Sequence, residues 1–200
     1  MTDERLSILH SIFAATAAAH EKFAGAGLPA VDRAADAIGD CLKAGGKVLA
    51  FGNGGSASDA QHLVAELVGR FEGERRALAA IGLTADSNVV TAIANDYGYD
   101  QVFVRQVEGL GRRGDVAFGI STSGRSANVR AALAAARAHG LVTIALTGRD
   151  GGPMGSEADI HLNVAEDATP RVQEVHRTIL HAMCTLIDWK IRAAESGARM

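Results

Sequence analysis

The feature that most constrains this chain is a hydroxyl-rich turn between an apolar run and a helical run. The turn is Gly119-Ile-Ser-Thr-Ser-Gly-Arg-Ser126. The apolar run 115–120 is typical of a buried strand, and residues 127–139 are Ala-rich with apolar side chains at helical spacing. A helix start presents unpaired backbone N–H groups and the positive end of its dipole. The turn is therefore predicted to favour an anion such as a phosphate.

Two interpretations of this turn stay open at this point. In the first, Ser126 caps the helix and the other hydroxyls are ordinary turn residues. In the second, all four hydroxyls bind phosphate, namely those of Ser121, Thr122, Ser123 and Ser126. Gly124 between them permits close approach of a ligand to the backbone. Four hydroxyls within six residues favour the phosphate interpretation.

Strand-like and helical runs alternate along the rest of the chain. Buried strands are predicted at 47–51, 77–83, 115–120, 142–146 and 159–164. Helices are predicted at 6–23, 31–43, 60–71, 88–95, 101–110, 127–139 and 172 to about 194. We expect Gly25-Ala-Gly27 to end the first helix, and a loop at 148–155. Alternation of this kind predicts an α/β fold, a three-layer α-β-α sandwich around a central parallel sheet.

Domain organisation follows from the absence of any linker or repeat. We expect one domain over 1–200, with 1–44 as an N-terminal helical arm that packs on other subunits. Apolar residues make up 48% and the net charge is −3, so no basic field indicates nucleic acid or a membrane as partner. No signal peptide and no membrane-length apolar run is expected. Cys41 and Cys184 lie in apolar helical patterns, which predicts core thiols and a cytoplasmic protein.

A second turn, Gly52-Asn-Gly-Gly-Ser-Ala-Ser-Asp59, follows the strand at 47–51. It lacks the third glycine of a dinucleotide fingerprint and the Gly-Lys of a P-loop. In open α/β sheets, ligands gather at the carboxyl ends of the strands. We therefore expect this turn to wrap its backbone amides around a sugar or a phosphate.

Five motifs occur in an order that resembles a known family. They are Gly52-Asn-Gly-Gly-Ser56, Ile93-Ala-Asn-Asp96, Ile120-Ser-Thr-Ser-Gly124, Leu146-Thr-Gly148 and Val172-Gln-Glu-Val-His176. The chain resembles the SIS-domain (sugar isomerase) proteins over nearly its whole length, and among them the phosphoheptose isomerases. Those enzymes convert sedoheptulose 7-phosphate to D-glycero-D-manno-heptose 7-phosphate. The resemblance implies a homotetramer with active sites between subunits, and a role in making heptose for bacterial surface glycans and lipopolysaccharide.

The residues also offer candidates for isomerase chemistry. An aldose–ketose isomerase moves a proton between C1 and C2 through an enediol, which requires a base and a group that handles the oxygen-bound protons. His62 and Glu66 are one helical turn apart and share a face, a pattern that also fits a solvated surface pair. His181 lies in an apolar context that fits a core histidine. The resemblance assigns catalysis to Glu66 and His181, in either order, and leaves His176 as a core or subunit-contact residue.

The remaining site residues are implied by the same resemblance. The substrate-binding set is Asn53, Gly54, Gly55, Ser56, Glu66, Asn95, Asp96, Ser121, Thr122, Ser123, Ser126 and Gln173. A zinc ion is implied on His62, Glu66, Gln173 and His181. Gln173 and His181 are about 12 Å apart along a helix, which long side chains can only just span. A metal-bound Glu66 is a poorer base, so the metal either poises the substrate hydroxyls or shifts during turnover.

One departure from the family pattern concerns a carboxylate. Some members carry Asp-Arg ahead of the Gln-Glu motif, whereas this chain has Thr169-Pro-Arg171. The helper carboxylate of those members is therefore missing here, so Asp96 supplies the only carboxylate for that role or Glu174 contributes a second one.

Two other functions compete with the isomerase. One is a non-enzymatic SIS protein that binds the bacterial replication initiator, whose relatives share the segment type seen at 88–96. The presence of both Glu66 and His181 favours the enzyme over this alternative. The other is a sugar-phosphate sensing module, which is usually fused to a DNA-binding domain.

Overall fold

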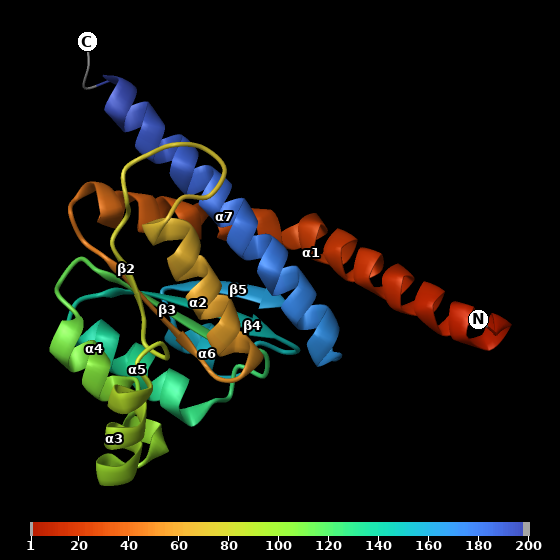
Figure 1. The fold of residues 1–200 in the computed structure, drawn as a ribbon, viewed down its shortest axis with the longest axis horizontal. Helices are drawn as coiled ribbons and strands as arrows, with labels where there is room; N and C mark the ends of the chain where they lie inside the picture. The colour runs from red at the N-terminus through yellow and green to blue at the C-terminus, as the bar shows by residue number, and fades with distance from the viewer. Residues whose placement is uncertain (1, 198–200) are drawn as a thin grey trace.

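The computed structural model describes residues 2–197 and places five parallel strands in one sheet (Figure 1). The strands are β1 (Val48–Gly52), β2 (Ala80–Gly82), β3 (Val116–Ser121), β4 (Val142–Gly148) and β5 (Ile160–Val164). Their order across the sheet is β2-β1-β3-β4-β5, and each neighbouring pair is parallel. The predicted parallel α/β sheet is confirmed.

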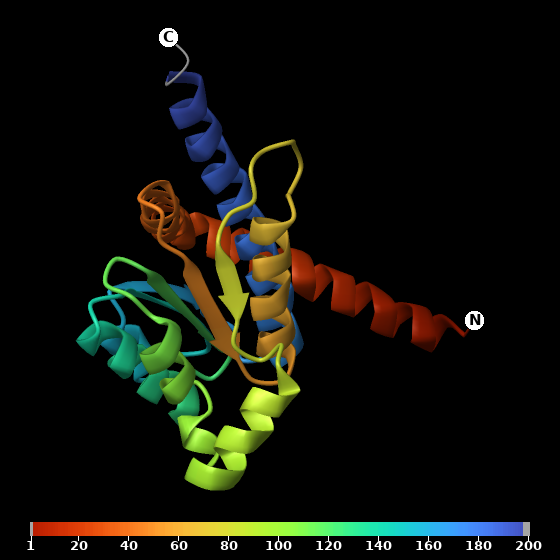
Figure 2. The same ribbon diagram turned by 60° about the vertical axis from the view of Figure 1, so that its left-hand side comes forward.

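Helices cover both faces of the sheet in three layers. They are α1 (Asp3–Lys43), α2 (Gly55–Val68), α3 (Ser87–Tyr97), the 3-10 helix η1 (Tyr99–Gln101), α4 (Val104–Leu110), α5 (Ala127–Ala138), α6 (Met154–Glu157) and α7 (Thr169–Gly197). α1, α2 and α7 pack on one face, and α4 and α5 pack on the other (Figure 2). Val48 and Ala50 of β1 face the first layer, while Leu49 and Phe51 face the second. Burial on both faces explains why the strands are continuous apolar runs.

The strand register aligns the carboxyl ends of β1, β3 and β4. Gly52 pairs with Ile120, and Ser121 pairs with Thr147. The glycine turn after β1 and the hydroxyl turn after β3 therefore lie side by side at one edge of the sheet, where parallel sheets bind their ligands.

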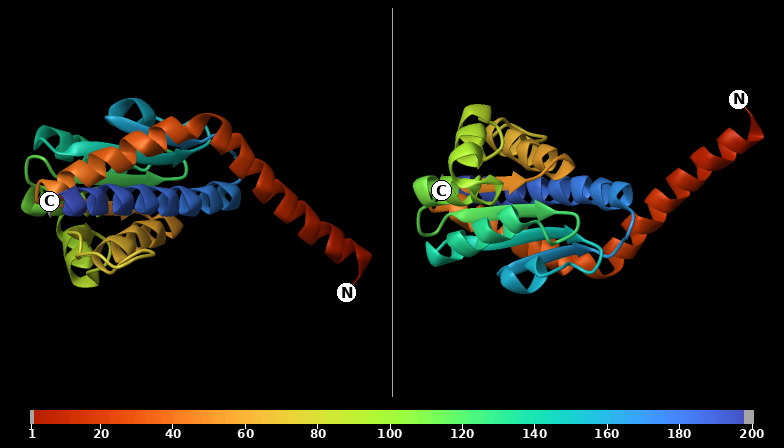
Figure 3. Two further views of the ribbon diagram at one scale, coloured as in Figure 1. Left: turned by 90° about the horizontal axis from the view of Figure 1, so that it is seen from above. Right: turned by 90° about the horizontal axis from the view of Figure 1, so that it is seen from below.

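The first helix differs from the prediction. Residues 3–43 form one helix, so the expected stop at 25–27 is wrong. Gly27 is helical and receives the Phe23 ring, which a Cβ at that position would overlap. Pro29 lies inside the helix and removes one backbone donor, and Figure 3 shows α1 changing direction part-way along its length. The helix ends at Lys43, and Gly45, just past the C-cap residue Ala44, has a φ of +84° and provides the left-handed residue that terminates many helices.

The first part of α1 projects beyond the rest of the molecule (Figure 1). Its large apolar side chains are exposed, with Ile8 at 54% and Phe13 at 74%. Burial begins at Ala19, and from there α1 packs along α7 and the sheet. Near the junction, Thr16 Oγ1 donates a hydrogen bond to Glu174 Oε2 at 2.8 Å. These exposed apolar side chains make no contact with the rest of the described chain that would bury them.

Most other boundaries differ by a turn or less, but α2 begins five residues before the predicted start at 60. α2 begins inside the predicted glycine turn, at Gly55, and α7 begins at Thr169 with Pro170 in its first turn, where proline is tolerated. The predicted helix 101–110 divides into η1 and α4, the loop 148–155 leads into the short α6, and β2 is shorter than 77–83. Within residues 2–197, no helix is both long and apolar enough to cross a bilayer.

Candidate functional site

The hydroxyl turn between β3 and α5 holds its side chains together without capping the helix. Ser121 Oγ lies 2.9 Å from Ser126 Oγ and 3.4 Å from Ser123 Oγ. Ser126 occupies the N-cap position of α5, yet its side chain makes no capping hydrogen bond. Gly124 has a φ of +63°, and a Cβ there would overlap the backbone of Gly151. This turn is a group of hydroxyls at a helix start, an arrangement suited to an anion.

The glycine turn joins β1 to α2 and packs directly against β3. Gly54 has a φ of +55° and precedes the first residue of α2. A Cβ on Gly52 would lie 2.8 Å from Ile120 O and 2.9 Å from Ser56 Cβ. Glycine at this position therefore lets Ser56, which is 4% exposed, approach β3 at the start of α2.

Two asparagine side chains tie the glycine turn to the start of α5. Asn53 Nδ2 donates to Asn128 Oδ1 at 2.9 Å, and Asn128 Nδ2 donates to Asn53 Oδ1 at 3.0 Å. Tyr99 OH donates to Asn53 Oδ1 at 3.2 Å. Sequence reasoning missed Asn128, which is buried. The available signal is a polar residue in the first turn of an otherwise Ala-rich helix.

His62, Glu66 and His181 form one cluster between α2 and α7. The two Nε2 atoms of the histidines lie 2.8 Å apart, so one ring donates and the other accepts. Glu66 Oε1 lies 3.4 Å from His62 Nε2. Desolvation, with a smaller contribution from the charge of Arg177, lowers the pKa of His62. A carboxylate beside two hydrogen-bonded imidazoles, all partly buried, is an arrangement that can move protons.

The side of α7 that faces α2 carries further polar residues. The Gln173 amide lies over Gly55, where a Cβ would overlap it. One helical turn later, Arg177 Nη2 lies 2.8 Å from Asp59 Oδ1. These residues line a pocket of about 410 Å³ at the start of α2. The pocket therefore joins the glycine turn to the stripe of α7 that leads to His181.

A family model for the SIS domain matches residues 13–148, which include the glycine turn, the hydroxyl turn and four of the five strands. The chain belongs to the SIS-domain family.

Relatives within the SIS-domain family narrow this assignment to the phosphoheptose isomerases. A phosphoheptose isomerase of Citrifermentans bemidjiense is 55% identical over 160 residues, which cover 80% of this chain and 83% of that protein. A phosphoheptose isomerase structure from Neisseria gonorrhoeae superposes with a TM-score of 0.87 at 45% identity, covering 92% of this chain and 98% of that one. One from Francisella tularensis gives a TM-score of 0.89 at 41% identity, covering 94% and 100%.

The zinc site implied by the SIS-domain resemblance is matched in donor type by three of its four residues. Two imidazoles and a carboxylate suit zinc. Their arrangement, however, is that of a hydrogen-bonded pair of histidines, and no group of three His, Cys, Asp or Glu within the described part of the chain is arranged to hold a metal. The structure places Gln173 against Gly55, two helical turns from His181. The zinc assignment stays a prediction.

The other predicted SIS-domain residues lie apart from this cluster. Asn95 and Asp96 are on the exposed side of α3, where Asn95 Nδ2 donates to Asp96 Oδ1 at 2.8 Å. His176 is fully buried, bonds Thr147 O through Nε2 at 2.9 Å, and has its pKa lowered to about 4 by desolvation. His176 is a core residue, in line with its interpretation from sequence.

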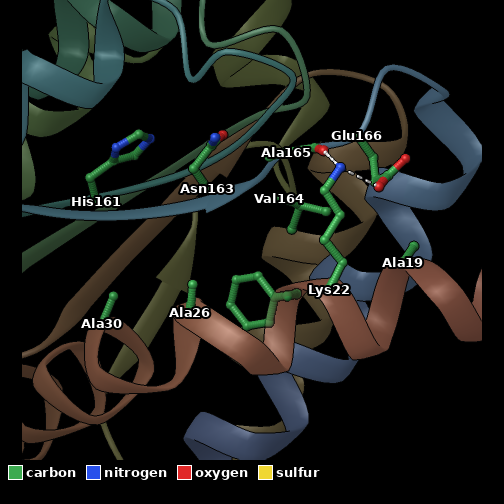
Figure 4. Close-up of a pocket in the computed structure, with 11 residues that line it drawn as sticks. Ala19, Lys22, Ala26, Ala30, His161, Asn163, Val164, Ala165 and Glu166 are labelled. Carbon is green, nitrogen blue, oxygen red and sulfur yellow. Dashed lines mark hydrogen bonds and ion pairs between the residues drawn. The ribbon is translucent and has the colours of Figure 1, made fainter.

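A second pocket, of about 350 Å³, lies between α1 and β5 (Figure 4). His161 and Asn163 project toward it from β5, and Lys22 Nζ closes one end by an ion pair with Glu166 Oε1 at 2.8 Å. Of the predicted substrate residues, Gly55 and Gln173 line the α2 pocket, and none lines this second pocket.

Proposed function

We propose that this chain interconverts sedoheptulose 7-phosphate and D-glycero-D-manno-heptose 7-phosphate, for the heptose of bacterial surface glycans and lipopolysaccharide. It is a phosphoheptose isomerase by family. The observation that carries the chemistry is the cluster of His62, Glu66 and His181 on helices that meet beside the glycine turn. An assay of the purified chain on sedoheptulose 7-phosphate tests the proposal, and an inactive wild-type chain would overturn it.

The mechanism divides between an anchor and a proton-transfer group. The hydroxyl turn and Ser56 hold the 7-phosphate at the start of two helices. Glu66 removes the proton from the reacting carbon, and His181 handles the protons on the oxygens, or the two exchange these roles. Burial at the α2–α7 contact strengthens the electrostatic interactions on which the transfer depends.

Zinc is a further part of the proposal. His62, Glu66 and His181 are the residues that would hold it, and the ion would supply a Lewis acid for the substrate hydroxyls.

A cytoplasmic location of the protein also stays a prediction.

The two competing functions use fewer of the observed features. A protein that binds the replication initiator or senses a sugar phosphate needs no Glu66–His62–His181 cluster. The fold and the two turns alone would serve it. The grouping of the predicted proton-transfer residues in one cluster favours catalysis.

Replacing Ser123 by alanine is expected to weaken substrate binding by about 1–3 kcal/mol, because one hydrogen bond to a charged group is lost. The measurements are KM for sedoheptulose 7-phosphate and Kd for inorganic phosphate by calorimetry. Ser156→Ala on α6, whose hydroxyl bonds Pro153 O, is the matched control. Unchanged affinity for both ligands in Ser123→Ala would remove the hydroxyl turn from the phosphate site.

We propose a homotetramer in which the exposed half of α1 and α7 pack between subunits. Light scattering is expected to give the mass of four 20.7 kDa chains. Phe13→Asp should weaken assembly, since Phe13 is 74% exposed on the apolar stripe, and should leave the circular dichroism of the sheet unchanged. A monomer of wild-type chain at micromolar concentration would contradict the assembly.

A further inference from the structure

Arg177 is a cation at the site that neither the predicted catalytic pair nor the predicted substrate set includes. It lies on α7 one helical turn after Gln173 and one turn before His181, so the three residues share a stripe. Its Nη2 lies 2.8 Å from Asp59 Oδ1 on α2, and its side chain is 35% exposed. The guanidinium is thus held at one edge by α2 while part of it stays open to the pocket.

The Asp59 carboxylate that pairs with Arg177 is buried and only partly hydrogen-bonded. It is 4% exposed, and among the described residues its Oδ2 has no hydrogen-bond partner. Burial raises the pKa of this carboxyl, an effect that the neighbouring Arg177 only partly offsets. A buried carboxylate with an unsatisfied oxygen, paired with a partly exposed guanidinium, is a weak source of stability. The contact does, however, fix the position of the Arg177 guanidinium at the pocket.

The pocket places Arg177 beside the glycine turn at the start of α2. Gly55 of the glycine turn and Gln173 line the same pocket of about 410 Å³. The charge of Arg177 also reaches His62 in the proton-transfer cluster. A sugar phosphate anchored at the hydroxyl turn would extend its carbonyl end past Gly55 toward His181, and so past Arg177.

The chemistry of an enediol reaction calls for a cation at this point. When the base removes the proton from C1 or C2, the C–H electron pair becomes part of a C1–C2 double bond. The carbonyl π pair then moves to its oxygen as negative charge. That oxygen is then protonated, the hydroxyl on the neighbouring carbon gives up its proton to become the new carbonyl, and the carbon-bound proton returns to the other carbon, so the isomerisation balances with no other reactant. A preorganised donor at the developing oxyanion is typically the largest single source of rate enhancement.

We propose that Arg177 donates hydrogen bonds to the oxygens on C1 and C2 and stabilises the enediolate, and that Asp59 is the positioning residue for its guanidinium. This inference rests on the proposed isomerase function. It adds Arg177 to the catalytic residues of that function. Arg177 belongs neither to the predicted metal ligands nor to the predicted substrate-binding residues.

The test uses Arg177→Met, which keeps an unbranched apolar stem and removes the charged guanidinium. We expect kcat to fall roughly 100-fold, as for the loss of an oxyanion donor. A six-carbon aldonohydroxamic acid 6-phosphate imitates the enediolate, so its Kd should rise by a similar factor while Kd for inorganic phosphate stays within about twofold. Arg130→Met, which breaks an exposed ion pair with Glu157 on the far side of the sheet, is the matched control and should leave all three values unchanged.

A second variant separates catalysis from structure. Arg177→Met leaves Asp59 buried without its cation, so it can lower the melting temperature for that reason alone. In Asp59→Asn with Arg177→Met the buried charge is gone, and we expect the melting temperature to recover while kcat stays low. Recovery of kcat in the double variant would overturn the proposal, as would normal kcat in Arg177→Met. Equal weakening of hydroxamate and phosphate would also overturn it, because Arg177 would then act on the phosphate. An inactive wild-type chain would instead defeat the proposed function itself.

Discussion

Glu66→Gln is expected to lower kcat by about 10²–10⁴-fold, because proton transfer by a positioned side chain contributes that much to the rate. The loss corresponds to about 3–5 kcal/mol in the barrier. The variant keeps the shape of the side chain and its place on α2, where Glu66 Oε1 lies 3.4 Å from His62 Nε2. Kd for inorganic phosphate should stay at the wild-type value, since the hydroxyl turn is untouched.

Two further variants make this expectation specific. His181→Gln should cause a loss of the same order, because the His181 ring contacts His62 in the same cluster. Glu157→Gln, the same chemical change on α6 in an exposed pair with Arg130, should leave kcat unchanged. Steady-state turnover with sedoheptulose 7-phosphate gives all three values. Near-wild-type turnover in Glu66→Gln would end the assignment of Glu66 as base and raise the non-enzymatic alternatives.

Arg75→Met is expected to lower the free energy of unfolding by about 3–5 kcal/mol, because the buried Asp188 carboxylate loses its nearer cation and keeps Arg192, at 3.5 Å. The Arg75 side chain is fully buried, and its Nε lies 2.5 Å from Asp188 Oδ1 on α7. The same guanidinium donates to the last carbonyls of α2, at 2.6 Å from Glu66 O and 3.0 Å from Leu67 O. One side chain therefore secures the end of α2, the helix that carries Glu66, to α7.

Urea denaturation at a fixed protein concentration measures this loss. Arg137→Met is the control: its pair with Asp159 is exposed, and its removal should cost less than about 1 kcal/mol. Arg75→Met combined with Asp188→Leu should recover much of the stability, since an apolar pair avoids the unpaired charge. If Arg75→Met and Arg137→Met lower the free energy of unfolding equally, the buried Arg75 pair contributes no more to stability than the exposed Arg137 pair.

The sheet and its ligand edge could be predicted because local pattern and topology agree. Each central strand is a continuous apolar run, and parallel pairing forces the turns after β1 and β3 to the same edge. The contact between His62 and His181, in contrast to the sheet, could not be predicted from local sequence pattern. Helical spacing places His62 beside Glu66, but only the packing of α7 on α2 brings His181 to them. Its assignment from sequence depended on resemblance, not on periodicity.

The failures arise where tertiary contacts override a local signal. Gly25 and Gly27 suggested a helix stop, yet a stop of that kind needs a left-handed residue, and that residue is Gly45. Packing of 31–42 on the sheet keeps the chain helical through the glycines. Asn128 was missed because its role depends on a partner 75 residues away, the Asn53 amide. Arg75 was passed over for the same reason.

The continuity of α1 has a consequence for the thermodynamics of assembly. An isolated helix of about 12–15 residues is only marginally stable in water, and the projecting part of α1 before Ala19 is of this order. Its helicity is supported at one end only, by the half that packs on α7. Burial of its apolar side chains against another subunit would stabilise the helix at the other end. Formation of the helix in this segment and association of the subunits would then be thermodynamically coupled. Dilution would then loosen the arm while leaving the sheet intact, and the affinity between subunits would carry the entropy of ordering these residues.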